Sequence, residues 1–481
     1  MSGSAKISAV VWAFLALAVS DLSASVQGQI VSFKSPNGIN EQCVALTPMP
    51  DGVYSAEDRQ IEKDYCGIDF YQDTIALCPK LSSTSPGTLV YSITQGKYAG
   101  NQSGFEKAVC PQGKIVVKTA DRAPVSYKMS MNDKNTSGTF STSSLLYYHF
   151  SRYFNTATHV PASVYRSMDK ETHLQRVSEP GLRWSVGKHR SKMDHAGWEV
   201  MTRAEKNPAS YHPVDELFSA DRKQVYGVLI SPRGKRYGVE VNGTRESGWG
   251  LGQYRDFEKT AAFQALSSDK PLPEAIQQGL HSAGKDNKMR RAMKGHTGPE
   301  QIAFWMQEVA EIVLMDYIFS QQDRIGNIDY LKYWYWKQDG ELRRQLADGK
   351  QPPSDIASFK PVLLKRTQLN DNDAGGRRSY ANFTKKAGLL EKLRHFNADT
   401  YQRLMALAQD FTKKGERYDH VSRVFGLSET QLRQLLDNTL QAASILERSC
   451  KSGKLKLDLD AEYFFLHRAG AESRQSCGRE I

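Results

Sequence analysis

The hydrophobic pattern of the chain changes from short runs in its first half to helical spacing in its second half. Early in the chain, brief apolar runs predict strands at residues 114–119, 125–131 and 160–165. Residues 141–154, before the last of these strands, have the spacing of a helix. From residue 386 to 447, leucines recur at helical spacing and predict several amphipathic helices. We therefore expect an α+β protein with a β-rich first part and a mainly helical second part.

Two polar turns follow strongly apolar elements in the second half. A buried helix predicted over residues 300–319 ends in the turn Gln321-Gln-Asp-Arg-Ile-Gly-Asn327, and a strand predicted over 361–369 leads into Asn370-Asp-Asn-Asp-Ala-Gly375. Phosphoryl transfer uses one carboxylate at the acceptor hydroxyl, and an amide and a second carboxylate that hold the metal on the nucleotide phosphates. An Asp-x-x-x-Asn turn followed by an Asp-x-Gly turn is typical of such a site. Either turn alone is weak support, because Asp and Asn are common turn formers.

Three other parts of the chain have distinct patterns. Residues 225–230 and 235–241 are apolar runs around a Ser-Pro-Arg-Gly turn, which predicts a hairpin. Residues 330–336 are strongly aromatic and predict a strand. The polar stretches 184–219 and 279–299 predict long surface loops, the second of them basic.

Composition limits the class of protein and its partners. The 481 residues are enough for two or three domains, and contents of 40% hydrophobic and 24% charged residues are ordinary for a globular protein. A formal net charge of +11 favours acidic partners such as nucleotide phosphates, acidic proteins, anionic glycans or membrane surfaces. A solvated basic surface without a partner is an equal alternative. The sequence has no basic run with interleaved aromatic residues, the pattern that would indicate nucleic-acid binding.

The N-terminus indicates export. Residues 1–28 combine Lys6, an apolar core from Val10 to Val19 and small residues before Gln29, which is the pattern of a secretory signal peptide. No later segment has the length and hydrophobicity of a membrane span. We expect a secreted protein, or one kept in a secretory-pathway or periplasm-like compartment.

Cysteine usage agrees with this location. The six cysteines are Cys43, Cys66, Cys78, Cys110, Cys450 and Cys477. Their even number predicts three disulfides in an oxidising compartment, one of them closing the C-terminal tail. Metal binding by these cysteines is the weaker alternative, because no two of them have the spacing of a zinc knuckle.

Five segments, in order along the chain, share a pattern with one known group of proteins. They are Lys114-Ile-Val-Val-Lys through Val125-Ser-Tyr-Lys-Met, Tyr148-His-Phe-Ser-Arg before Val160-Pro, Leu229-Ile-Ser-Pro with Tyr237-Gly-Val-Glu, Met315-Asp-Tyr-Ile-Phe-Ser-Gln-Gln-Asp-Arg, and Leu369-Asn-Asp-Asn-Asp-Ala-Gly. Together they resemble the atypical kinases of the secretory pathway, namely the Golgi casein kinase family and its glycan xylosylkinase relatives, and more distantly HipA-type kinases. The resemblance covers roughly residues 113–450.

The resemblance implies a fold, a reaction and a set of site residues. The fold is a two-lobed atypical protein-kinase-like fold, and the reaction moves the γ-phosphoryl group of ATP to a hydroxyl of a protein (Ser/Thr) or glycan acceptor with Mg²⁺ or Mn²⁺. Asp323 would be the catalytic carboxylate, and Lys128 would contact the ATP phosphates. Asp373 and Asn327 would bind the metal, with Asp371 as the competing assignment for the principal metal ligand.

The sequence pattern and the resemblance together divide the chain into four parts. A signal peptide spans residues 1–28, and a cysteine-containing, disulfide-bearing N-terminal extension spans 29–112. A kinase-like N-lobe with an insertion spans 113–243. A helical C-lobe with the catalytic and metal-binding segments spans 244–481.

The sequence departs from the family pattern in the helix over residues 141–154. That helix carries an orienting Glu in the family, but the closest register places Ser144 there. Either Glu106 or Asp121 supplies the missing acid from elsewhere, or catalysis is impaired.

Two other hypotheses follow from this departure and from the turns. The chain could be a secreted pseudokinase that binds nucleotide or a partner without phosphoryl transfer. It could also be a secreted binding or structural protein in which both acidic turns are only turns. The last hypothesis predicts that Asp323 and Asp373 lie far apart.

Overall fold

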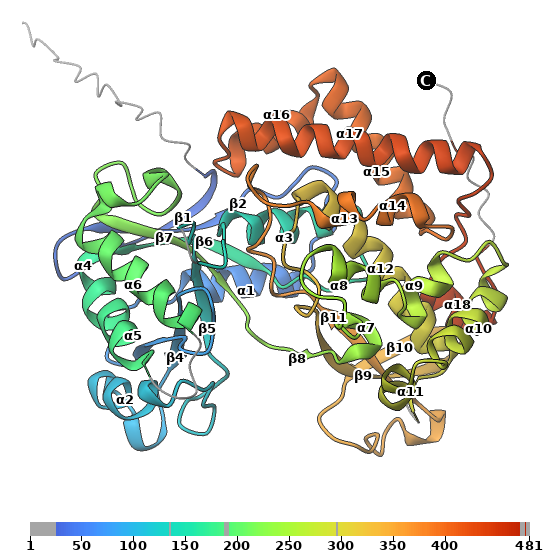
Figure 1. The fold of residues 1–481 in the computed structure, drawn as a ribbon. Helices are drawn as coiled ribbons and strands as arrows, with labels where there is room; N and C mark the ends of the chain where they lie inside the picture. The colour runs from blue at the N-terminus through green and yellow to red at the C-terminus, as the bar shows by residue number, and fades with distance from the viewer. Residues whose placement is uncertain (1–25, 134–135, 187–191, 295–296, 472–476, 478–481) are drawn as a thin grey trace, which may run out of the picture.

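The computed structural model describes residues 26–133, 136–186, 192–294, 297–471 and 477. Figure 1 shows a lobe built on a large sheet beside a second, mainly helical lobe, with long helices along one side of it. The predicted fold class, α+β with a β-rich N-terminal lobe and a mainly helical C-terminal lobe, is confirmed. Of the predicted signal peptide, residues 1–25 lie outside the described residues.

The N-lobe is built on one antiparallel sheet of seven strands. Its order is β1 (Gly28–Lys34), β2 (Asn40–Leu46), β6 (Ser163–Asp169), β7 (Gln224–Ile230), β5 (Val125–Met129), β4 (Gly87–Ser92) and β3 (Ile75–Pro79). Four of these strands come from the segment 29–112, so the sheet continues across the boundary that the sequence suggested. The strand predicted at 114–119 is wrong. Ile115 and Val117 are 48% and 47% exposed, and β4 takes the place beside β5.

Helices cover this sheet and complete the N-lobe core. They are α1 (Ala56–Cys66), α2 (Gln102–Val109), α3 (Thr142–Phe154), α4 (Lys170–His173), α5 (Glu179–Trp184) and α6 (Lys192–Lys206). The helix predicted over 141–154 is confirmed as α3. The loop predicted over 184–219 is wrong in part, because residues 192–206 form α6, which buries Trp198 and Met201 in the core.

A second antiparallel sheet belongs to the other lobe. Its strands are β10 (Glu341–Leu346), β9 (Asp329–Gln338), β11 (Val362–Gln368) and the short β8 (Lys235–Arg236). The predicted hairpin over 225–241 is wrong, because β8 pairs with β9 rather than with β7. Residues 231–234 carry the chain from one sheet to the other, and Val239–Asn242 form the helical turn α7.

The C-lobe is organised around one buried helix. Its helices are α8 (Leu251–Phe257), α9 (Ala261–Leu266), α10 (Leu272–Ala283), α11 (Asn287–Met293), α12 (Pro299–Phe319), α13 (Phe383–Lys386), α14 (Leu389–Lys392), α15 (Ala398–Lys413), α16 (Glu416–Val424), α17 (Glu429–Lys451) and α18 (Ala461–His467). Every residue of α12 from Gln301 to Phe319 is buried, with α9, α17, α18 and β11 packed around it. The loop predicted over 279–299 is wrong, because α10 and α11 occupy most of it.

Carboxylates within α12 are buried and bonded. Glu308 binds Arg366 of β11 at 2.5 Å, and Glu311 accepts hydrogen bonds from the backbone of residues 157 and 158. These contacts offset the cost of burying charge. Among the described residues, no helix has both the length and the apolar character needed to cross a membrane.

Three disulfides join the six cysteines, as the sequence predicted. They are Cys43–Cys66, Cys78–Cys110 and Cys450–Cys477. The first ties β2 to α1, the second ties β3 to the end of α2, and the third ties the end of α17 to the tail.

Removal of the first disulfide tests its contribution to stability. We expect Cys43→Ser/Cys66→Ser to lower the free energy of unfolding by about 3 kcal/mol, because the bond closes a loop over a sequence separation of 23 residues in the unfolded chain. Denaturant unfolding of the oxidised proteins measures this. A difference below about 1 kcal/mol would contradict the expectation.

Candidate functional site

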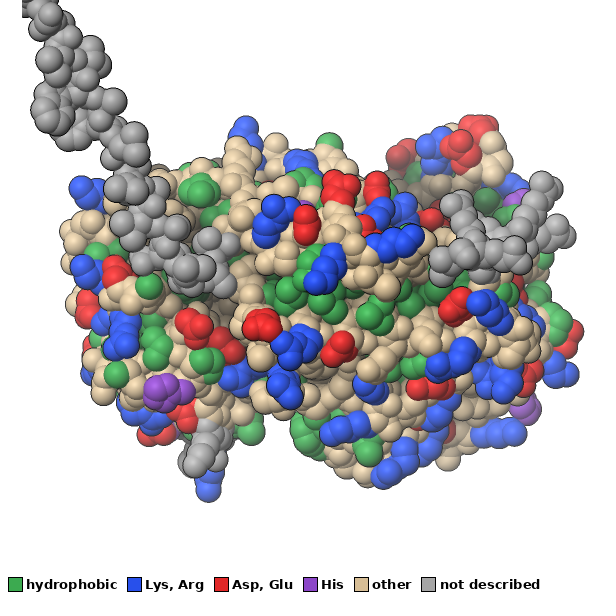
Figure 2. Space-filling model, turned by 90° about the horizontal axis from the view of Figure 1, so that it is seen from above, with side chains coloured by type: hydrophobic (Ala, Val, Ile, Leu, Met, Phe, Trp, Pro, Cys, Tyr) green, Lys and Arg blue, Asp and Glu red, His purple; other side chains and the backbone are tan. Residues whose placement is uncertain are grey.

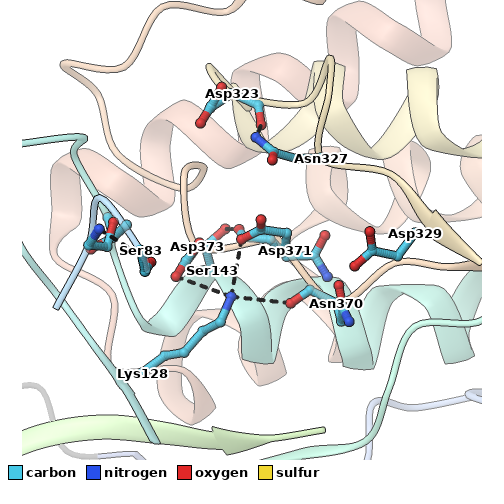
Figure 3. Close-up of polar contacts among 12 residues, drawn as sticks. Ser83, Lys128, Ser143, Asp323, Asn327, Asp329, Asn370, Asp371 and Asp373 are labelled. Carbon is cyan, nitrogen blue, oxygen red and sulfur yellow. Dashed lines mark hydrogen bonds and ion pairs between the residues drawn. The ribbon is translucent and has the colours of Figure 1, made fainter. Parts of the chain in front are cut away.

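The site begins with Lys128 on β5, in the middle of the seven-stranded sheet. Its Nζ atom lies 3.2 Å from the Asn370 carbonyl oxygen, 3.2 Å from Asp371 Oδ1 and 3.4 Å from Asp373 Oδ2. Figure 3 shows the lysine pointing at this turn, with Asp323 on the opposite side of it. The structure thus brings together the lysine and both carboxylates that the sequence proposed, across more than 240 residues of chain.

The turn at residues 321–327, predicted to be catalytic, is joined through its backbone to the turn at residues 370–375, predicted to bind metal. These are called the catalytic turn and the metal-binding turn. The amide of Gln322 donates to the carbonyl of Ala374 at 3.0 Å, and the amide of Gly376 donates to the carbonyl of Phe319 at 2.6 Å. Asp323 and Asp373 are therefore each one residue from a direct hydrogen bond between the two turns. The hypothesis that placed the two carboxylates far apart is wrong.

A close approach at Gly375 permits this contact. A Cβ atom at this position would lie 2.9 Å from Ser143 Oγ and 3.1 Å from the Phe319 carbonyl oxygen, so a larger residue would push α3 and α12 away from the turn. The close packing of α3 and α12 against this turn therefore explains why the Asp-Ala-Gly motif ends in glycine.

Arg324 fixes the position of both turns. Its guanidinium is buried and donates to both carboxylate oxygens of Asp316 on α12, at 3.0–3.2 Å. The same group donates to the carbonyl of Asp371 and to Oδ1 of Asn372, both at 2.9 Å. Tyr147 of α3 completes the network by donating to Asp316 Oδ1 at 2.6 Å. Two turns and two helices therefore share one cation.

The three site carboxylates have different electrostatic surroundings. Burial alone would raise the pKa of Asp371. This effect is outweighed by the positive charges of Lys128, Lys80 and Arg236, which hold the pKa well below its usual range. Burial raises the pKa of Asp373, and Lys128 only partly offsets this. Its side chain is 10% exposed, against 35% for Asp371.

Asp323 has the character of a proton acceptor. Burial raises its pKa, and the negative charges of Asp371 and Asp373 add to the effect. A carboxylate with a raised pKa is a better general base than an ordinary one. The influence of both other carboxylates also shows that all three share one electrostatic environment.

Asn327 lies in the same turn but faces a cation. Its amide nitrogen donates to the carbonyl of Asp323 at 2.9 Å, and its Oδ1 accepts from the guanidinium of Arg236. Arg236 also contacts Asp329 Oδ1 at 2.6 Å and Asp371 Oδ2 at 3.5 Å. The family resemblance implies that Asn327 binds the metal. In this structure its side-chain oxygen instead accepts a hydrogen bond from Arg236.

The acid missing from α3 is not replaced by either residue that the sequence suggested. Glu106 pairs with Arg176 at 2.6 Å, and Asp121 accepts hydrogen bonds from Ser92, Thr94 and Gln95. Lys128 pairs instead with the two carboxylates of the metal-binding turn. Asp371 and Asp373 are therefore the acidic partners of Lys128 in this structure.

The serine that faces the metal-binding turn is Ser143 rather than Ser144. Ser143 Oγ donates to the carbonyl of Asn372 at 2.6 Å, and both serines are fully buried. Ser143 is the neighbour on α3 of Ser144, the position at which the resemblance places the missing acid.

The donor set suits a divalent cation that also binds phosphate. Among the described residues, no group of three or more His, Cys, Asp or Glu side chains is arranged to hold a metal ion alone. Mg²⁺ is commonly bound by one or two carboxylates, with substrate phosphates and water completing its shell. Asp373 and Asp371 provide that number of oxygen ligands, so the residues present fit Mg²⁺ or Mn²⁺ bound together with a nucleotide.

Sequence reasoning missed three charged residues of the site, namely Lys80, Arg236 and Asp329. Asp329 begins β9 directly after the catalytic turn, and Arg236 arrives from β8. Arg236 and Asp329 reach the site because β8 pairs with β9. The predicted hairpin between β7 and β8 would have put Arg236 elsewhere.

A separate cavity of about 690 Å³ lies in the C-lobe between α15 and α17. Its lining includes Arg403, which pairs with Asp399, and Arg417, which pairs with Asp51 and Asp410. Charges in this cavity thus neutralise one another. We therefore take the carboxylates around Lys128, rather than this cavity, as the candidate site.

Comparisons with known proteins give limited support. No protein-family model matches the chain, and no curated protein matches it by sequence. The crystal structure of the Golgi casein kinase with Mn/ADP bound is similar over 82% of this chain and 77% of that chain, with 10% identity and a TM-score of 0.37. A TM-score this low does not establish a shared fold, so the family resemblance stays a prediction.

Substitution of Arg324 tests the shared-cation network. We expect Arg324→Met to lower the free energy of unfolding by about 3–5 kcal/mol, because it leaves the buried Asp316 without a cationic partner. The double variant Asp316→Asn/Arg324→Met should recover part of this loss. Thermal and urea unfolding provide the measurement.

Arg433 provides the matched control. It forms an exposed pair with Glu429 on α17, so Arg433→Met should change stability by less than about 0.5 kcal/mol. Equal losses for Arg324→Met and Arg433→Met would contradict the role of Arg324.

Proposed function

We propose that this protein is a secreted ATP-dependent kinase that moves the γ-phosphoryl group to a hydroxyl of a protein or glycan acceptor. One observation carries the proposal: Lys128 is bonded to Asp371 and Asp373 directly beside the turn that holds Asp323. A cation for phosphate, carboxylates for metal and a carboxylate for the acceptor are the parts that phosphoryl transfer needs. Mg²⁺ or Mn²⁺, when bound, would neutralise charge on the phosphates.

The proposal then gives each residue of the site its part in the reaction. Lys128 binds phosphate oxygens in place of its present carboxylate partners. Asp373, the more buried carboxylate, is the principal metal ligand, while the more exposed Asp371 orients Lys128 and contributes a second oxygen. Asp323 accepts the proton of the acceptor hydroxyl, which its raised pKa favours.

The surroundings also support a location. Three disulfides are expected in an oxidising compartment and are rare in the cytosol, so we propose that the protein works in the secretory pathway or outside the cell. On the face shown in Figure 2, basic side chains are interspersed with acidic ones rather than gathered into a single field.

A pseudokinase is the second candidate, and Arg236 is the observation that favours it. The guanidinium donates a hydrogen bond to the side-chain oxygen of Asn327 and lies 3.5 Å from Asp371 Oδ2. Two residues proposed as metal ligands are therefore already in contact with a cationic side chain. A protein held in this state would bind nucleotide without transferring phosphate. Nucleotide binding without transfer is the outcome that would select this candidate.

Asparagine variants of the three carboxylates test the proposed function. We expect Asp373→Asn and Asp323→Asn to lower autophosphorylation or ATP hydrolysis by about 100-fold or more, with little change in melting temperature, because each removes a charge that acts on the reaction. The measurement follows ³²P from γ-labelled ATP in the presence of Mn²⁺. Thermal shift with ATP and Mn²⁺ should be lost in Asp373→Asn and kept in Asp323→Asn.

Asp437 on α17 is exposed and distant in sequence from both turns, so Asp437→Asn is the control and should retain full transfer. Full activity in Asp373→Asn together with loss in Asp371→Asn would move the principal metal role to Asp371. Full activity in all three site variants would refute the proposal.

A further inference from the structure

A second lysine lies in line with Lys128 across the strands of the N-lobe sheet. Gly87 of β4 pairs with Lys128 of β5, and the amide of Lys80 donates to the carbonyl of the same Gly87 at 2.8 Å. Residues that lie directly opposite on antiparallel strands project to the same face. Lys80 and Lys128 therefore project from one face of the sheet, two strand spacings or about 10 Å apart at their Cα atoms.

The residue between the two lysines has no side chain. A Cβ atom at Gly87 would meet only the Tyr127 carbonyl oxygen, at the ordinary contact distance of 3.5 Å, so the backbone does not demand glycine there. Glycine leaves no side chain between the two cationic side chains, and the position of its missing Cβ is free of clashes. A phosphate group requires such a space together with positive charge on both sides.

Lys80 also lacks the partners that Lys128 has. Within the part of the chain that the structure describes, its ammonium has no hydrogen-bond or ion-pair partner, although the residue is half-buried. Burial and the nearby charge of Lys128 lower its pKa, and Asp371 and Asp373 act in the opposite direction. A half-buried ammonium without a partner is unfavourable, and an anion would relieve that cost.

Lys80 comes directly before the loop that connects β3 to β4. Residues 81–86 of this loop read Leu-Ser-Ser-Thr-Ser-Pro, and the hydroxyl of Ser85 is hydrogen-bonded to the hydroxyl of Ser137. Lys80 therefore stands at the base of a hydroxyl-rich loop, where the charges of Asp371 and Asp373 act on its ammonium group. An anion between the two lysines would be adjacent to Asp373, the proposed metal ligand.

We propose that Lys80 is a second phosphate-binding residue, which holds the phosphates of ATP together with Lys128 over the open position at Gly87. The proposal rests on the proposed function, because it assigns the same site a second cationic contact. It also goes beyond that function, since two lysines, one on β5 and one directly after β3, then hold the phosphates together.

Binding of ATP and of adenosine to the intact protein, measured by calorimetry with Mn²⁺, tests the role of Lys80. We expect Lys80→Met to weaken ATP binding by about 10- to 100-fold, because a charge-assisted contact to phosphate is lost. Adenosine, which has no phosphate, should bind equally to both proteins, and Lys80→Arg should restore most of the ATP affinity. Lys97→Met removes an exposed lysine of the same lobe and should leave both affinities unchanged.

A second variant tests the space rather than the charge. Gly87→Val fills the position between the lysines with a residue that favours strands, and it should also weaken ATP binding relative to adenosine. Unchanged ATP affinity in Lys80→Met, with ATP bound by the wild type, would overturn the role of Lys80 alone. Absence of ATP binding by the wild type would overturn the proposed function and this inference with it.

Discussion

The buried guanidinium of Arg324 is the constraint on which the rest of the site depends. It is bound by the Asp316 carboxylate of α12 and by two groups of the metal-binding turn, and Tyr147 of α3 binds the same carboxylate. Burial of a charge pair is costly, and the cost is offset only when most donors and acceptors are satisfied. Because the donors come from one residue, the two turns cannot shift independently without leaving a buried charge unpaired.

This rigidity gives the carboxylates their different properties. Asp371 is held between Lys128 and Arg236 and has a lowered pKa, whereas Asp323 has a raised pKa because it is buried near two negative charges. The same cations and carboxylates would have little effect on one another if they were mobile and solvated. Preorganised charge of this kind is usually the largest contribution to catalysis of charged reactions.

Local pattern in the sequence was sufficient for much of the fold and part of the site. Helices α3 and α12 and strands β5 and β9 follow from hydrophobic spacing within single segments, and the three disulfides follow from the even number of cysteines. Lys128 and the two turns could be brought together only through the family resemblance, because they are more than 190 residues apart in the sequence. The structure then confirmed their proximity, while their roles remain proposals.

Features that depend on long-range strand pairing could not be predicted. The place of β3 and β4 in the sheet puts Lys80 beside Lys128, and the pairing of β8 with β9 brings Arg236 to Asn327. Neither pairing has a signal within its own segment, because register is set by the partner strand. The ion pairs of Lys128 with Asp371 and Asp373 are likewise long-range contacts that no local pattern indicates.

The central claim is that Lys128 and Asp373 bind a nucleotide and its metal together. Crystals grown with Mn²⁺ and a non-hydrolysable ATP analogue, measured at the manganese absorption edge, test this directly. We expect an anomalous peak within coordination distance of the Asp373 carboxylate, with the phosphates between that peak and Lys128. Manganese and nucleotide bound away from this turn, for example in the cavity between α15 and α17, would contradict it.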